Sequence, residues 1–168
     1  NSLASLVLNY RVDPDTNMVS VGMTYNGAGY YSAKIPGQKT GALVAFHIQA
    51  TDGSTAAART LFPNDAPERE CLIRYGEPSQ GGNFGTYRVW LTKKNLDLWS
   101  QREKLDNAPI DSTFVYGSQR AVYNVGALYA GSPFLSPGYD SPTGNLCGYV
   151  FEFPEDDLCL NATDFTMD

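Results

Sequence analysis

The strongest constraint on the fold is a segment in which apolar side chains recur at every second position. In LVAFHIQA, residues 43–50, the side chains of Val44, Phe46 and Ile48 fall on one side of an extended chain, and His47 falls on the other. A period of two is typical of a half-buried β-strand and does not fit a helix. The turn signal TDGS follows at once. We therefore expect a β-strand whose polar side, including the His47 ring, faces solvent.

Similar segments recur through residues 1–77, separated by turns rich in Gly, Asp and Pro. Several short strands at regular spacing predict an immunoglobulin-like β-sandwich. Roughly five or six strands are recognisable, whereas such a sandwich needs about seven. We therefore expect the first strands to be missing. They would be supplied by the remainder of a longer chain or by another chain that pairs along residues 3–12.

A second region follows a stretch rich in Gly, Ser and Pro. Residues 78–86 are the best linker candidate, because the stretch around them, GEPSQGGNFGT, has no periodicity. Residues 87–168 begin with the strand YRVWLT, and Thr92 is placed to cap a helix over KKNLDLWSQREKL. We expect Gln101 and Arg102 to face solvent near the end of that helix.

Three more strands are predicted after the helix. STFVYG and RAVYNVGALYAG form a hairpin around GSQ. CGYVFEF is a further strand, with Phe151 and Phe153 on one face and Glu152 on the other. We expect Trp90 and Trp99 to anchor the core of this region, because large aromatic side chains at strand or helix spacing are usually buried.

Three stretches of this second region carry a resemblance to a known family: YRVWLTKKNLDLW, DSTFVYGSQRAVYNVGALYAGSPF and CGYVFEFPEDDLCLNATDF. The pattern YNVG…Y.GSP after a TFVY hairpin is specific, since it fixes strand, turn and loop together. Residues 87–168 thus resemble the spore-coat CotH family of kinase-like proteins, and residues 1–77 resemble the immunoglobulin-like module often found before them. The resemblance implies a mainly β chain: a truncated immunoglobulin-like β-sandwich followed by a β-rich α+β kinase-like N-lobe with one helix.

The loop YAGSPFLSPGYDSPTG, residues 129–144, has two interpretations. The resemblance implies that Gly131 and Ser132 match the Gly-Ser of a nucleotide loop, in which backbone N–H groups face phosphate oxygens. The alternative is a plain connection, stiffened by three prolines that have no amide hydrogen. No Lys or Arg follows Arg120 in the sequence. We therefore expect no cation beside the loop, which favours the connection.

Active members of the family transfer the γ-phosphoryl group of ATP to a hydroxyl of a protein. This transfer needs cationic charge from Lys and Mg²⁺. The chain has no counterpart of the acidic residues that hold the metal and orient the hydroxyl in active relatives. The resemblance therefore implies no catalytic residue here, and we do not expect the chain alone to be an enzyme. ATP with Mg²⁺ or Mn²⁺ would bind the intact parent, an atypical protein kinase.

The cysteines and one sequon bear on the compartment. Cys147 and Cys159 flank GYVFEFPEDDL, a spacing that a hairpin would close into a disulfide in an oxidising compartment. Cys71 would then be a free, buried thiol. Asn161 begins the sequon Asn-Ala-Thr, which matters only in a eukaryotic secretory pathway, and an ordinary loop asparagine is the commoner case. With the resemblance, we expect an extracellular or cell-surface location.

No metal site is expected. DPDTN places Asp13 and Asp15 like the opening of a calcium loop, but Met18 stands where that loop needs Gly, so a turn is the better interpretation. The acidic run at 155–157 predicts a solvated loop. His47 is the only histidine, which argues against zinc.

Charge and hydropathy exclude two classes of partner. A formal charge of −6 disfavours nucleic acid, which needs a basic surface, and no stretch approaches about 18 apolar residues, so no membrane span is expected. We therefore expect a fragment of a secreted or cell-surface CotH-like protein with a nucleotide-binding-type N-lobe. The alternative is a non-catalytic structural or adhesive surface module. Its many aromatic rings would then contact a surface protein or a glycan.

Overall fold

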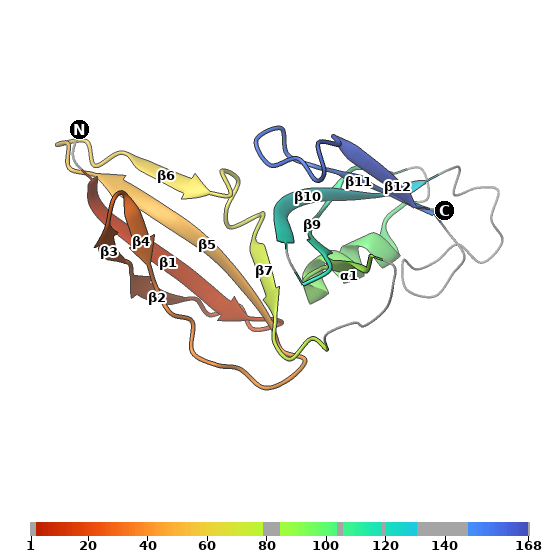
Figure 1. Cartoon of the computed structure of the whole chain (residues 1–168), viewed down its shortest axis with the longest axis horizontal. Coiled ribbons are helices and arrows are strands. Elements are labelled where there is room, and N and C mark those ends of the chain that lie inside the picture. The colour runs from red at the N-terminus through yellow and green to blue at the C-terminus, as the bar shows by residue number, and fades with distance from the viewer. Residues whose placement is uncertain (1–2, 79–84, 104–105, 119, 131–147, 168) are drawn as a thin grey trace. The chain divides into compact units, whose positions relative to one another are not determined.

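The computed structural model describes residues 3–78, 85–103, 106–118, 120–130 and 148–167. The prediction of a mainly β chain is confirmed, with twelve strands and one helix among these residues. The chain divides into two compact units, Asn1–Pro78 and Ser79–Asp168. This division falls where the predicted linker, residues 78–86, begins. Figure 1 labels the elements of both units.

The first unit is built on a five-stranded antiparallel sheet, called here the first sheet. Its strands are β1 (Leu3–Val12), β2 (Val19–Gly22), β5 (Leu43–Asp52), β6 (Arg59–Phe62) and β7 (Cys71–Arg74). β1 lies between β2 and β5. The other edge of β5 is shared, because β7 pairs with residues 43–46 and β6 with residues 48–51. The long strand β5 is therefore the centre of the sheet (Figure 1).

Two more short strands, β3 (Thr24–Gly27) and β4 (Tyr30–Ser32), form a separate hairpin. The first unit thus has seven described strands, and the count of five or six was too low because MVSVGMTY divides into β2 and β3. β1 pairs with β5 along its length and with β2 over residues 7–10. Both edges of β1 are therefore occupied over residues 7–10, and the pairing of another chain along residues 3–12 stays a prediction. The immunoglobulin-like arrangement itself stays a prediction.

Both faces of the first sheet are covered near its centre. Residues directly opposite each other on antiparallel strands share a face. One face carries a set of buried apolar side chains: Leu8, Tyr10, Phe46 and Cys71. On the other face Ala45 is 0% exposed and His47 only 9%. The expectation that the His47 ring faces solvent is therefore wrong, because the buried Arg11–Glu70 pair lies on this face of β5.

The second unit is a five-stranded antiparallel meander, called here the second sheet. Its strands are β8 (Tyr87–Trp90), β9 (Ile110–Tyr116), β10 (Arg120–Ala130), β11 (Gly148–Glu152) and β12 (Asp164–Met167). Each strand pairs with the next along the chain. The helix α1 (Lys93–Gln101) connects β8 to β9 (Figure 1). The predicted β9–β10 hairpin and the strand at CGYVFEF are both confirmed.

The start of α1 follows the sequence closely. The Thr92 hydroxyl oxygen accepts a hydrogen bond from the backbone N–H of Asn95 at 3.2 Å, so the predicted cap is confirmed. The end of the helix differs from the expectation. Arg102 adopts an extended conformation (φ −66°, ψ 158°), and the helix stops at Gln101. Leu98 is exposed and Trp99 is 3% exposed, so one face of the helix packs on the sheet.

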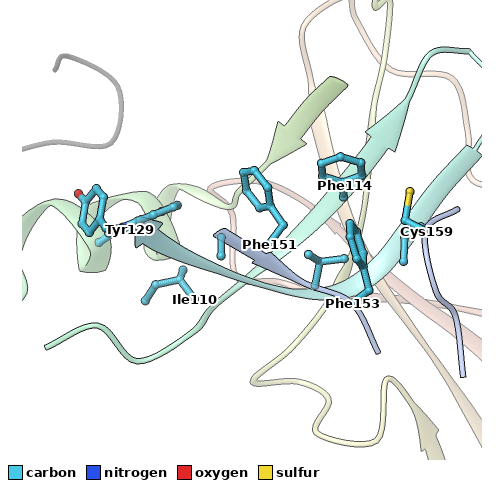
Figure 2. Close-up of a cluster of buried hydrophobic side chains, with 10 residues drawn as sticks. Ile110, Phe114, Tyr129, Phe151, Phe153 and Cys159 are labelled. Carbon is cyan, nitrogen blue, oxygen red and sulfur yellow. The ribbon is translucent and has the colours of Figure 1, made fainter. Parts of the chain in front are cut away.

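Aromatic side chains fill the core of the second unit. The Phe114 ring, 0% exposed, has its centroid 5.4 Å from that of Phe151 and 5.2 Å from that of Phe153. Figure 2 shows Tyr129 at one end of this cluster and Cys159 near the other. Such tilted and edge-on ring pairs are favourable geometries for aromatic side chains. Trp99 joins the cluster as expected, whereas Trp90 is half-buried outside it.

Candidate functional site

The glycine-rich loop lies between two neighbouring strands. Gly131, Ser132 and Cys147 are outside the described residues, so their predicted roles stay predictions. The residues that flank the loop are described, and Ala130 at the end of β10 pairs with Gly148 at the start of β11. The loop therefore joins two adjacent antiparallel strands at one end of the second sheet.

A cationic side chain lies at this same end of the sheet. The guanidinium carbon of Arg102 is 5.1 Å from the ring centroid of Tyr129 and 5.6 Å from that of Trp99. The centroids of Trp99 and Tyr129 are 5.0 Å apart, and Tyr149 lies 6.0 Å from Trp99 on the neighbouring strand β11. We call Trp99, Arg102, Asn107, Tyr129 and Tyr149 the arginine–aromatic cluster.

The end of α1 positions Arg102. Its backbone N–H donates to the carbonyl of Leu98 at 3.0 Å, which closes the last turn of the helix. The positive side chain therefore stands at the helix C-terminus, where the helix dipole favours a cation. Trp99 is three residues earlier and faces the sheet, so the guanidinium group can lie over its ring.

Asn107 ties Arg102 to the last residues of β10. The Asn107 amide donates to the carbonyl of Tyr129 and accepts from the N–H of the same residue, both at 3.0 Å. Arg102 Nη2 donates to the Asn107 side-chain oxygen at 2.9 Å, and Nη1 donates to the Ala108 carbonyl at 2.7 Å. The guanidinium group is thus held beside Tyr129, which precedes Gly131 by two residues in the sequence.

Two N–H groups of the cluster remain without a partner among the described residues. They are Arg102 Nε and Trp99 Nε1, and both atoms are buried. A buried N–H that forms no hydrogen bond is costly, and such groups usually bind a further acceptor. A delocalised cation with nearby N–H donors and flat rings can hold an anionic oxygen or a planar group.

The sequence analysis missed Arg102. We expected this side chain to face solvent, whereas it is half-buried over the rings of Trp99 and Tyr129. The expectation of no cation beside the loop concerns residues 131–147, which lie outside the described part, and stays a prediction. Arg102 precedes the loop by almost thirty residues in the sequence, and no local signal indicates that its side chain lies over Tyr129.

The remaining candidate residues lie on and around the segment after β11. Cys159 is 1% exposed, and burial raises the pKa of its thiol. Its predicted pairing with Cys147 involves a residue outside the described part. Asn161 is exposed in a tight turn with φ 63°, and the N–H of Ala162 donates to the Cys159 carbonyl at 3.0 Å. The sequon asparagine is therefore accessible.

The first unit contains a buried cluster of charged side chains around Arg11. Arg11 Nε donates to Glu70 at 3.0 Å, and Nη1 donates to the Asp13 carboxylate at 3.1 Å and the Asp15 carbonyl at 2.9 Å. The second guanidinium nitrogen also pairs with Glu70. The hydrogen bond to Glu70 raises the pKa of Arg11, although burial opposes this. Asp13 therefore lies at the predicted turn and pairs with Arg11, and its position does not require a bound calcium ion.

His47 lies on the same face of the first sheet as Arg11. Burial lowers the pKa of His47, and the nearby charge of Glu70 partly opposes this shift. Its Nδ1 atom has no hydrogen-bond partner within the described residues. We interpret the buried imidazole of His47 as a structural element of this unit.

Three further observations on the described residues concern metal binding, membrane crossing and the acidic run. No group of three or more His, Cys, Asp or Glu side chains comes together in the described ranges to hold a metal ion. No helix in the described part has the length and apolar character needed to cross a bilayer. The acidic run at 155–157 is largely exposed, and Asp157 pairs with Arg120.

Comparisons with protein-family models, with curated proteins and with solved structures gave no match. The resemblance to the CotH family therefore stays a prediction from the quoted sequence stretches.

Proposed function

We propose that residues 87–168 form the nucleotide-binding-type N-lobe portion of a secreted or cell-surface CotH-like protein, and that residues 1–77 are its companion module. The chain supplies contacts to a nucleotide and no catalytic group of its own. A parent protein with a C-lobe would provide the metal ligands and the group that orients the attacking hydroxyl. The product of such a parent would be a phosphorylated protein.

The observation that carries this proposal is a cation beside the end of β10, the strand that precedes the glycine-rich loop in the sequence. Arg102 lies 5.1 Å from the Tyr129 ring, two residues before Gly131. Phosphoryl-transfer sites need positive charge near the nucleotide oxygens, and the sequence after Arg120 contains none. In this proposal the Arg102 guanidinium of the arginine–aromatic cluster supplies this charge. ATP with Mg²⁺ or Mn²⁺ is the cofactor to test.

Nucleotide binding is the direct test. The chain contains two tryptophans, and Trp99 is part of the cluster, so ATP titrated with Mg²⁺ or Mn²⁺ should change its fluorescence. Replacement of Trp90 by Phe isolates the Trp99 signal. We expect saturable binding, and we expect Arg102→Ala to weaken it about tenfold, since a charge-assisted contact is lost.

Two controls separate a nucleotide contact from a purely structural role. Arg120→Ala removes an exposed arginine of the same unit that pairs with Asp157, and it should leave binding unchanged. Asn107→Ala removes the tie to Tyr129 and keeps the cation, so it should weaken binding less than Arg102→Ala does. Absence of ATP binding at millimolar concentration by a folded chain would reject the nucleotide proposal.

A second candidate function is a non-catalytic adhesive module. It is favoured by the exposed tyrosines of the β3–β4 hairpin, of which Tyr30 is 74% exposed. The exposed Asn161 supports the proposed extracellular location in a eukaryotic host, because glycosylation needs an accessible asparagine. Secretion from a eukaryotic cell followed by intact-mass measurement would test the location, and Asn161→Gln should remove any added glycan mass.

A further inference from the structure

The β3–β4 hairpin exposes three tyrosine side chains. We call residues 24–32 the tyrosine hairpin (Figure 1). Tyr25 is 56% exposed, Tyr30 74% and Tyr31 36%. Tyr25 pairs directly with Tyr31 across the strands, so these two rings share one face, and Tyr30 points to the opposite face. Both faces of the hairpin therefore present an aromatic ring.

The hairpin is ordered by its own contacts. The ring centroids of Tyr25 and Tyr31 are 5.0 Å apart with the planes tilted by 51°. The Tyr25 hydroxyl oxygen accepts a hydrogen bond from the N–H of Gly29 at 3.3 Å. The side chain of Asn26 donates to the Ser32 hydroxyl oxygen at 2.7 Å. These contacts hold the Tyr25 and Tyr31 rings in place before a ligand arrives, which lowers the entropy cost of binding on that face.

The chemistry around the rings is neutral and polar. Residues 16–33 contain no Asp, Glu, Lys, Arg or His, although 18% of the whole chain is charged. The hairpin itself has no Leu, Ile, Val, Met, Phe or Trp. Its other side chains are those of Ala, Thr, Ser and Asn. The Thr and Ser hydroxyls and the Asn amide both donate and accept hydrogen bonds.

This combination selects among ligand classes. An acidic glycan or a phosphate would need cations, and the hairpin offers none. A protein interface is usually anchored by Trp, Tyr, Arg or large apolar residues at a desolvated centre, and of these the hairpin carries only its exposed tyrosines. A neutral sugar presents C–H faces that pack on aromatic rings and hydroxyl groups that pair with Asn, Ser and Thr.

We propose that the tyrosine hairpin binds a neutral oligosaccharide. One sugar unit packs on the exposed Tyr30 ring, or on the Tyr25–Tyr31 pair of the opposite face, and its hydroxyls bond to the polar side chains between them. This inference rests on the second candidate function, the adhesive module, and does not depend on nucleotide binding by the second unit. It assigns the first unit a ligand of its own.

The test uses the full chain and four probes. Neutral hexasaccharides of β-1,4-linked glucose, mannose and xylose are titrated calorimetrically, and a heparin hexasaccharide serves as the acidic probe. We expect at least one neutral probe to bind and heparin not to bind. Tyr30→Ala or Tyr31→Ala, whichever removes a ring from the face that holds the sugar, should weaken that binding about five- to tenfold.

Phe62→Ala is the matched control, because Phe62 is an exposed aromatic side chain of the same unit, 48% exposed on β6. It should leave the affinity unchanged. The inference is overturned if no neutral probe binds, if only heparin binds, or if the tyrosine variants bind as well as the unmodified chain. Sedimentation of the same variants distinguishes failure of the sugar assignment from failure of the adhesive module. If no sugar binds but Tyr30→Ala abolishes self-association of the chain, the adhesive module stands and the sugar assignment fails. If neither sugar binding nor self-association is observed, both fail.

Discussion

The two units are both antiparallel sheets, but they bury different kinds of side chain. The second unit is filled by aromatic rings around Phe114, which is 0% exposed. The first unit also buries a charged pair, Arg11 and Glu70, whose side chains are 10% and 8% exposed. The partners of this pair are 59 residues apart in the sequence. A ring can pack against any apolar neighbour, whereas a buried charge needs one particular partner.

This difference predicts two kinds of failure. Removal of a ring from the second unit leaves a cavity, and its cost follows the volume lost. Removal of one charge from the first unit leaves the other charge buried and uncompensated. Trp90 and Trp99 both belong to the second unit, so fluorescence follows its unfolding, while hydrogen exchange of peptides from residues 3–78 follows the first unit.

The largest expected effect is from Phe114→Ala. We expect the free energy of unfolding of the second unit to fall by about 4 kcal/mol, because a fully buried ring that contacts Phe151 and Phe153 is lost. Urea unfolding monitored by tryptophan fluorescence measures this. Leu98→Ala, at a 52% exposed position of α1, should change the value by less than about 0.5 kcal/mol. Equal losses for the two variants would contradict the assigned core.

Glu70→Gln should destabilise the first unit by about 3 kcal/mol, since Arg11 would remain buried without its counter-charge. Hydrogen exchange of the β1 and β5 peptides would report the loss. The control is Glu77→Gln, which removes a carboxylate paired with the half-exposed Arg74 at 3.0 Å. We expect its cost to stay below about 1 kcal/mol. A similar cost for both variants would show that burial of the Arg11 pair is unimportant.

Thr92→Ala should cost the second unit about 1 kcal/mol, because the N–H of Asn95 loses its acceptor at the start of α1. Thr92→Ser keeps the hydroxyl oxygen and should recover most of this stability. Both values come from the same fluorescence-monitored unfolding experiment. If the serine variant were as unstable as the alanine variant, the loss would come from the Thr92 methyl group and not from the cap.

The smallest expected effect concerns pH. Burial lowers the pKa of His47 in the folded first unit, whereas an unfolded histidine titrates near about 6.5. Below that pH the unfolded chain binds more protons than the folded one, so the free energy of unfolding should fall as the pH decreases from about 6.5 towards the folded pKa. Above that range the contribution does not change.

His47→Gln should remove this part of the pH dependence. Unfolding of the first unit in urea at about pH 7.5 and about pH 5.5 compares the variant with the unmodified chain. The second unit contains no histidine, so its fluorescence-monitored transition provides an internal reference. An unchanged pH dependence of the first unit in the variant would contradict the burial of His47.

Local sequence signals predicted most elements of the second unit, with the exception of β12 (Asp164–Met167). The Thr92 cap, the β9–β10 hairpin and the alternation of CGYVFEF all depend on residues within a few positions of one another. The elements of the first unit were harder to predict from local signals. MVSVGMTY reads as one strand by alternation, and the break between β2 and β3 depends on which neighbour each half pairs with.

The sequence by itself determined that the chain is mainly β, where α1 begins, and which segment carries no charge, because periodicity, capping and composition are local properties. The tertiary structure alone decided the surroundings of His47, Arg11 and Arg102. The burial of His47 and the pairing of Arg11 with Glu70 depend on β7 returning to β5. The position of Arg102 over Tyr129 depends on where α1 meets β10. Such contacts join residues far apart in the chain, and no short window of sequence contains both partners.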